Sequence, residues 1–129
     1  LIIENADTAM ELACNKHKAS FYNYTVGPVY ISGNKKGRHE WLIEFLSPPI
    51  NLEDFAYSLD TELKKLNSDY EAKRYKDLAL EIPQIKILRS GTFDKWLKKK
   101  NMLGGQNKIP RLSNNRKYLD DILKLISNV

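Results

Sequence analysis

Two neighbouring stretches, FYNYTVGPVYIS at residues 21–32 and HEWLIEFL at residues 39–46, decide the fold of this chain. Both are rich in the aromatic and β-branched side chains that strands favour, and GNKKG at residues 33–37 has the composition of a turn. In the second stretch the odd-numbered residues carry rings or apolar chains, whereas Glu40 and Glu44 fall on the opposite face. The two stretches therefore predict an antiparallel hairpin with one face in a core.

The alternation in the first stretch breaks at Gly27-Pro28. Tyr22, Tyr24 and Val26 share one face before this point, and apolar residues resume on the other parity from Val29. Proline removes a ladder donor and glycine tolerates unusual backbone angles. A β-bulge is therefore expected at Gly27-Pro28.

Apolar residues at helical spacing predict helices on either side of the hairpin. These helices are expected over residues 5–18, 52–66, a short stretch after residue 67, 93–100 and from about 115 to 126. Thr8 with Glu11 is a candidate capping box for the first helix, and Asn51 is a candidate N-cap for the second. With a short strand at residues 85–88, the predicted fold class is α+β. It is a small, mainly antiparallel β-sheet packed against several α-helices in a single domain, residues 1–129.

Composition narrows the classes of function. Lys and Arg number 21 against 16 Asp and Glu, and the net charge of +5 suits a phosphate-bearing partner without requiring one. The apolar runs fall far short of the ~20 residues that span a bilayer, so no membrane partner is expected. Cys14 is the single cysteine, which excludes an internal disulfide and suits a reducing compartment. The start LIIE lacks an initiator Met and the features of a signal peptide, so we expect a cytoplasmic piece of a longer protein.

Cys14 and His17 lie one helical turn apart, a spacing that can bind a metal. Two more ligands would be needed, and His39 is the only other histidine, so no metal site is predicted. We interpret Cys14 as a half-buried helical cysteine. A Cys/His nucleophile is no better supported, because no third group orients the base.

The basic run Lys98-Lys99-Lys100, with Lys95 and Lys108 nearby, invites a nucleic-acid interpretation. No recognised nucleic-acid-binding motif accompanies it, and Trp96 falls at core spacing. A solvated helix face is the simpler interpretation, so no nucleic-acid partner is expected. Nucleic-acid binding by this region stays as a third hypothesis.

The aperiodic segment at residues 101–112 holds the strongest candidate residue. Lys108 lies between Gly104-Gly105 and Pro110 and has no evident packing role. A lysine is a compact charge on a flexible stem, suited to a phosphate or a carboxylate. An exposed loop lysine without a function is the alternative. The segment lacks the spacing and the Ser/Thr of a Walker loop.

Several segments recur together in a recognisable order. They are Tyr24-Thr25-Val26, Gly37-Arg38-His39-Glu40-Trp41, Leu59-Asp60 with Tyr70 and Arg74, Ser90-Gly91-Thr92-Phe93, and Gln106-Asn107-Lys108-Ile109-Pro110-Arg111. Over about residues 8–126 their order and spacing resemble the C-terminal domain of the auxin-responsive Gretchen Hagen family, the acyl acid amido synthetases. The Gly-Thr-Phe turn, followed about thirteen residues later by Gln-x-Lys-x-Pro-Arg, is the most specific part. The His-Glu-Trp sequence resembles the bacterial branch.

The resemblance implies an activity for a larger parent protein. Enzymes of this family activate a carboxylic acid with ATP and Mg²⁺ to an acyl-adenylate, then transfer the acyl group to the amine of an amino acid. A large N-terminal domain holds the nucleotide and acyl sites, and nothing in this sequence resembles its motifs. The resemblance thus implies a mobile C-terminal lid whose partner is its own N-terminal domain. As an isolated domain it is expected to be inactive and to bind no cofactor.

The same resemblance assigns roles to the loop. Lys108 matches the family lysine that is expected to meet the α-phosphate and carboxylate oxygens during adenylation. Gln106 and Arg111 match the same motif and are expected to orient the loop, with Gly104-Gly105 as its hinge. Asn107 departs from the family, where many plant members have an aromatic residue. The alternative function is a non-catalytic interaction module that binds an acidic protein or a nucleotide.

Overall fold

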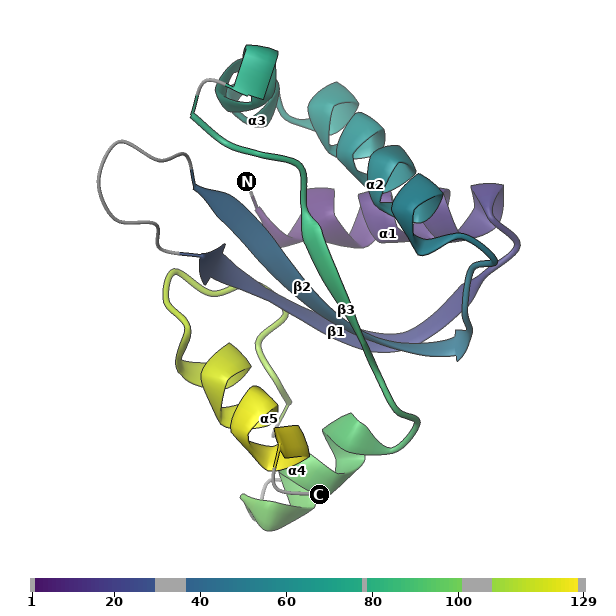
Figure 1. Ribbon diagram of the computed structural model, residues 1–129, viewed down its shortest axis with the longest axis vertical. Coiled ribbons are helices and arrows are strands. Elements are labelled where there is room, and N and C mark those ends of the chain that lie inside the picture. Colours follow the sequence, from purple (N-terminus) through teal and green to yellow (C-terminus); the bar gives the residue numbers. More distant parts are fainter. Residues whose placement is uncertain (1, 30–36, 78, 101–107, 128–129) are drawn as a thin grey trace.

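The fold combines α-helices with three strands in the part of the chain that the structure describes. A computed structural model describes residues 2–29, 37–77, 79–100 and 108–127. The elements are α1 (Ile3–Lys16), β1 (Ser20–Val29), β2 (Arg38–Ser47), α2 (Leu52–Leu66), α3 (Ser68–Arg74), the 3-10 turn η1 (Tyr75–Asp77), β3 (Gln84–Leu88), α4 (Thr92–Lys99) and α5 (Lys117–Ser127). The predicted α+β class is confirmed (Figure 1). Within the described residues, no helix is both long and apolar enough to cross a bilayer.

The three strands form one sheet in the order β1-β2-β3. β1 and β2 are antiparallel, which confirms the hairpin, and β3 adds to β2 in parallel. The irregularity in β1 lies between Ser20 and Asn23, near its start. Gly27 and Pro28 pair in regular register with β2. The bulge predicted at Gly27-Pro28 is therefore wrong.

The early shift in register changes which side chains share a face. Phe21 packs against the core that contains Tyr24, whereas Tyr22 is 43% exposed. Gly27 meets a different requirement, because a Cβ there would lie 2.9 Å from Leu119 Cδ1 and 3.1 Å from the carbonyl oxygen of Asn115. Glycine at this position lets α5 approach β1 closely.

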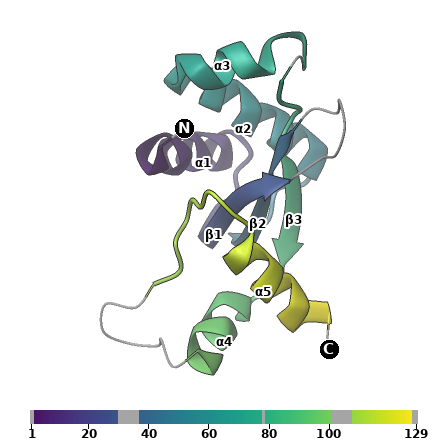
Figure 2. The same ribbon diagram turned by 90° about the vertical axis from the view of Figure 1, so that its left-hand side faces the viewer.

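Helices cover both faces of the sheet (Figures 1 and 2). α1 and α2 pack on one face, where Tyr24 stacks on Trp41 with ring centres 5.4 Å apart. α4 and α5 pack on the other face around Leu42 and Leu88. The alternation along β2 predicts this division, because Trp41 and Leu42 belong to opposite cores.

Asparagine side chains begin two of the helices. Asn51 accepts a hydrogen bond from a backbone N–H of the first turn of α2 at 3.0 Å, as predicted. Asn67 does the same for α3 at 2.8 Å. α1 begins at Ile3, well before Thr8, so the capping box predicted at Thr8 is wrong. The apolar stripe of α1 extends further toward the N-terminus than the cap pattern indicated, and Thr8 lies inside the helix.

The start of α4 is capped by a carboxylate from the sheet. Glu44 of β2 accepts hydrogen bonds from the backbone N–H groups of Gly91 at 2.8 Å and Phe93 at 2.9 Å. Gly91 has φ of +89°, a conformation that favours glycine. A negative charge at this end of a helix is also stabilised by the helix dipole. The Ser90-Gly91-Thr92-Phe93 segment is thus accounted for by folding.

Candidate functional site

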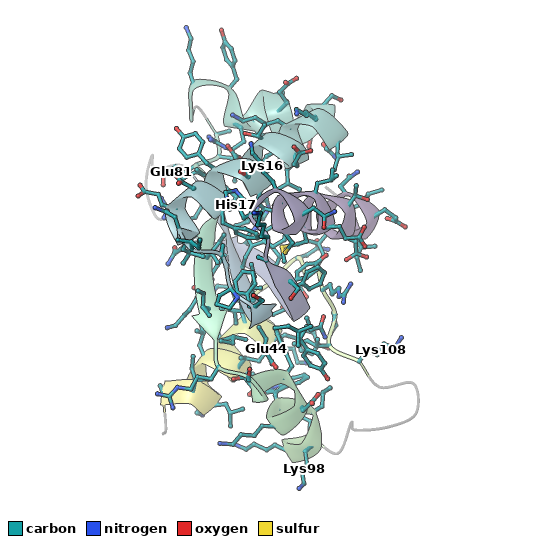
Figure 3. The ribbon with its side chains drawn as sticks, turned by 90° about the vertical axis from the view of Figure 1, so that its right-hand side faces the viewer. Lys16, His17, Glu44, Glu81, Lys98 and Lys108 are labelled. Carbon is teal, nitrogen blue, oxygen red and sulfur yellow. The ribbon has the colours of Figure 1, made fainter. Side chains whose placement is uncertain are left out.

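Lys108 is the first described residue after α4 and the segment 101–107. Its side chain is exposed, and Figure 3 shows it pointing away from the body of the domain. Gln106, Gly104 and Gly105, the other loop residues predicted to support it, lie outside the described residues. The surroundings of the site are therefore defined from Lys108 onward.

The residues after Lys108 are fixed to the domain. Ile109 is only 4% exposed and packs in the α4–α5 core. The hydroxyl of Thr25 donates to the carbonyl oxygen of Pro110 at 2.7 Å. Next, the N–H of Val26 donates to the carbonyl oxygen of Arg111 at 2.8 Å. Lys108 thus immediately precedes a segment, residues 109–111, that is fixed to the domain by packing and hydrogen bonds.

Arg111 ties this segment to both β1 and α1. Its Nε donates to Oδ1 of Asn23 at 2.8 Å, and its Nη1 donates to Oδ1 of Asp7 at 3.0 Å. The hydroxyl of Tyr24 donates to the same Asp7 oxygen, and the Arg111 guanidinium carbon lies 5.0 Å from the centre of the Tyr24 ring. Burial and the bond to Asp7 raise the pKa of Tyr24, so this hydroxyl remains protonated. The contacts of Arg111 are those expected of a residue that orients the loop, a role that stays a prediction.

Sequence patterns did not single out the partners of this segment. Thr25 belongs to a segment that carried the family resemblance, but no pattern assigned it a role. Asp7 and Asn23 gave no signal at all, because their contacts to Arg111 span 104 and 88 positions respectively. Contacts over such separations leave no local periodicity.

Tyr70 and Arg74, which lie one turn apart on α3, converge on the buried carboxylate of Asp60. Arg74 donates to Asp60 from Nε at 2.7 Å and Nη2 at 2.8 Å, and the Tyr70 hydroxyl donates at 2.6 Å. Burial acts to raise the pKa of Asp60, but the hydrogen bonds from Arg74 and Tyr70 outweigh it and hold the pKa below its usual value. Arg74 Nη1 also donates to the carbonyl oxygen of Leu80 at 3.0 Å. The network joins α2, α3 and Leu80, which precedes β3. Its role is therefore structural.

The pair Cys14 and His17 does not form a nucleophile. Nε2 of His17 lies 2.7 Å from Oγ of Ser58, and the ring packs edge-on against Phe55. Cys14 is 4% exposed, more buried than predicted, and burial raises the pKa of its thiol to about 11. The thiolate is therefore scarce at neutral pH. In the part of the chain that the structure describes, no group of three or more His, Cys, Asp or Glu side chains could hold a metal ion.

The basic run forms the last turn of α4 and its C-cap. Lys98 and Lys99 are exposed, and Figure 3 shows Lys98 at the end of the helix. Lys100 pairs with Asp121 of α5 at 3.1 Å. The indole N–H of Trp96 donates to the same carboxylate at 2.6 Å, and Trp96 is 2% exposed, which confirms its place in the core. Nucleic-acid binding by this region stays a hypothesis.

Comparisons with known proteins identify the family. The fold is similar to solved structures described as "AtGH3.15 acyl acid amido synthetase in complex with 2,4-DB" (18% identity, TM-score 0.69) and "GH3.15 acyl acid amido synthetase" (19% identity, TM-score 0.69). Each likeness covers 94% of this chain but only 23% and 24% of the other chains, so this chain spans about a quarter of their length. None of the curated proteins matches the sequence. The family model for the GH3 family C-terminal domain matches residues 4–117, and the chain therefore belongs to the GH3 family as its C-terminal domain.

Proposed function

We propose that this chain is the C-terminal lid of an ATP-dependent acyl acid amido synthetase and supplies Lys108 to the adenylation step. Membership of the GH3 family supports this class of parent enzyme. The position of Lys108 is the observation that supports its role. Its ammonium group is exposed, and the next two residues, Ile109 and Pro110, are fixed to the domain. The His39-Glu40-Trp41 sequence supports a parent of the bacterial branch, and the single cysteine suits a cytoplasmic one.

Adenylation brings two anions together. A carboxylate oxygen attacks the α-phosphorus of ATP, the bond to the bridging oxygen breaks, and pyrophosphate leaves. Negative charge accumulates on the α-phosphate oxygens in the transition state, where a positioned ammonium group is most effective. Lys108 can serve this step because its side chain is exposed while the backbone of the residues that follow it is fixed, which lowers the entropy cost of reaching the phosphate.

The nucleotide and its metal require residues beyond this chain. We assign Mg²⁺ and most ATP contacts to the N-terminal domain of the parent, as the family resemblance implies. That domain is the partner of this chain and also selects the carboxylic acid and the amino acid. Gly104-Gly105, which lies outside the described residues, stays our proposed hinge for a lid that closes between the two half-reactions.

The test is pyrophosphate release by the full-length parent with ATP, Mg²⁺ and a panel of carboxylic acids. We expect Lys108→Ala to lower the adenylation rate about a hundredfold, roughly 2.7 kcal/mol of transition-state stabilisation. Lys98→Ala is the matched control, because Lys98 is also exposed but lies on α4, and its rate should equal that of the wild type. Equal rates for Lys108→Ala and wild type would remove Lys108 from this step. No pyrophosphate from any acid would favour the interaction module that binds an acidic protein or a nucleotide.

A further inference from the structure

One buried hydroxyl group fixes the segment that carries Lys108. Thr25 is 0% exposed, and its Oγ1 donates to the carbonyl oxygen of Pro110 at 2.7 Å. We infer that Thr25 is a positioning residue for Lys108, acting through this hydrogen bond. The inference rests on the proposed function of Lys108 and extends it to a residue of β1.

The backbone between Lys108 and Pro110 has little freedom, so a shift of Pro110 also moves Lys108. Ile109 is packed in the α4–α5 core, and the pyrrolidine ring of Pro110 restricts its own φ angle. Lys108 therefore follows wherever the Pro110 carbonyl is held. The backbone bonds of Val26 act further along, at Arg111 and beyond.

A threonine at this position is hard to explain by packing alone. Thr25 lies on β1 between Tyr24 and Val26, both fully buried, and its register partner Leu42 belongs to the α4–α5 core. Valine has nearly the same shape and would not bury a hydroxyl group, whose burial is unfavourable unless it is hydrogen-bonded. The hydrogen bond to the Pro110 carbonyl therefore accounts for a threonine, and not a valine, at this position.

β1 offers a matched control for the loss of a hydroxyl group. Tyr22 also donates a hydrogen bond from β1 to another element, to Asp94 of α4 at 2.6 Å. That bond does not touch the segment that carries Lys108. Tyr22→Phe removes a hydroxyl from the same strand without releasing Pro110.

The experiment measures the rate of acyl-adenylate formation by the full-length parent at saturating ATP over a range of acid concentrations. Thr25→Val, Thr25→Ser and Tyr22→Phe are each compared with wild type, and Thr25→Val is also combined with Lys108→Ala. Small displacements of a reacting group cost up to about a hundredfold in rate, and Arg111 still holds the segment, so we expect about a tenfold loss for Thr25→Val with the KM for the acid unchanged. Thr25→Ser keeps the hydroxyl and should retain most of the rate, although it loses a buried methyl group and with it some thermal stability.

The combined variant separates positioning from folding. If Thr25 acts through Lys108, Thr25→Val causes no further loss once Lys108→Ala is present. The same tenfold loss in both backgrounds, a wild-type rate for Thr25→Val, or equal losses for Thr25→Ser and Thr25→Val would overturn the positioning role. A wild-type rate for Lys108→Ala alone would instead overturn the proposed function, and the positioning role would fall with it.

Discussion

Replacing Arg74 by Met would test how far the α2–α3 junction depends on one cation. Asp60 is 1% exposed and receives two hydrogen bonds from Arg74, at 2.7 and 2.8 Å. Arg74 is 8% exposed and donates a third bond to the carbonyl of Leu80. Methionine preserves much of the packing of the arginine stem. It leaves the carboxylate with Tyr70 and with Lys64, whose ammonium is 3.4 Å away.

The structure sets the size of the effect. Removing one partner of a buried ion pair costs about 3–5 kcal/mol, because the other charge stays buried without compensation. The remaining bond from Tyr70 places the expected loss for Arg74→Met near the lower end, about 3 kcal/mol. Lys64→Met removes a cation from the same carboxylate at a partly exposed position and should cost below ~1 kcal/mol. Replacing the whole network by Asp60→Leu, Tyr70→Phe and Arg74→Met should recover most of the loss, since no buried charge remains.

The pH dependence gives an independent sign. The folded-state pKa of Asp60 lies below its unfolded value of 3.8, so the stability that it contributes is present above pH 3.8 and is lost as pH falls through the folded pKa. Without Arg74, burial raises the folded pKa of Asp60, and protonation then favours the folded state. The deficit of Arg74→Met relative to wild type should therefore be largest at pH 7 and should shrink as the pH approaches 4.

The assay is urea unfolding of the 129-residue chain followed by tryptophan fluorescence, because urea does not screen ion pairs. A loss below ~1 kcal/mol for Arg74→Met, or a deficit that does not change with pH, would refute the reasoning. So would a triple replacement that is less stable than Arg74→Met alone.

Three further changes probe other parts of the fold. Gly27→Ala places a methyl group against Leu119 and should cost about 1–3 kcal/mol, measured as a lower urea midpoint with an unchanged slope. Burial, with a smaller effect of Lys73, lowers the pKa of His39, so below pH 6.5 the unfolded state binds more protons and stability falls between pH 7 and pH 5. His39→Gln should make that decline shallower in urea titrations at the two pH values. Glu44→Ala removes the acceptor for two N–H groups at the start of α4 and should cost about 1–3 kcal/mol, with lower helical circular dichroism at intermediate urea.

Each of these has a result that would count against it. Gly27→Ala with wild-type stability would mean that α5 does not need its close approach to β1. An equal slope of stability against pH in wild type and His39→Gln would exclude His39 as its source. Glu53→Ala, at an exposed position of α2, is the control for Glu44→Ala, and equal losses in the two would exclude the cap as the cause.

Sequence periodicity predicted what depends on near neighbours. The hairpin and the Asn51 cap follow from spacings of two to four residues, and the structure has both. The sequence places the bulge wrongly because a glycine next to a proline is typical of a backbone irregularity. In the structure Gly27 is required instead by the close approach of α5, about ninety residues later in the chain. The register of β1 depends on which of its side chains pack against α1 and α2, and the local sequence pattern does not determine this packing.

The candidate site was predictable only in part. The loop composition drew attention to Lys108, and the family resemblance gave it a role. The bonds that hold its backbone join residues 85 to 104 positions apart, so they depend on the finished fold. Thr25 and Asp7 could be found only once the segment after Lys108 was placed beside β1.

The pairing of Val26 with residues 111–113 has a consequence for synthesis of the chain. This isolated parallel bridge covers the outer edge of β1 at Val26, with bonds of 2.8 and 3.0 Å to its backbone. An uncovered edge can pair with another chain and aggregate. Because the covering residues are translated long after β1, the edge stays open on the ribosome until they emerge, and closing so long a loop is slow. Closing this part of the edge and fixing the segment after Lys108 are then one late event, so a nascent chain stopped before residue 111 would carry Lys108 without the backbone bonds of Arg111 and Ser113 to Val26, and its β1 edge would be open to pairing with another chain.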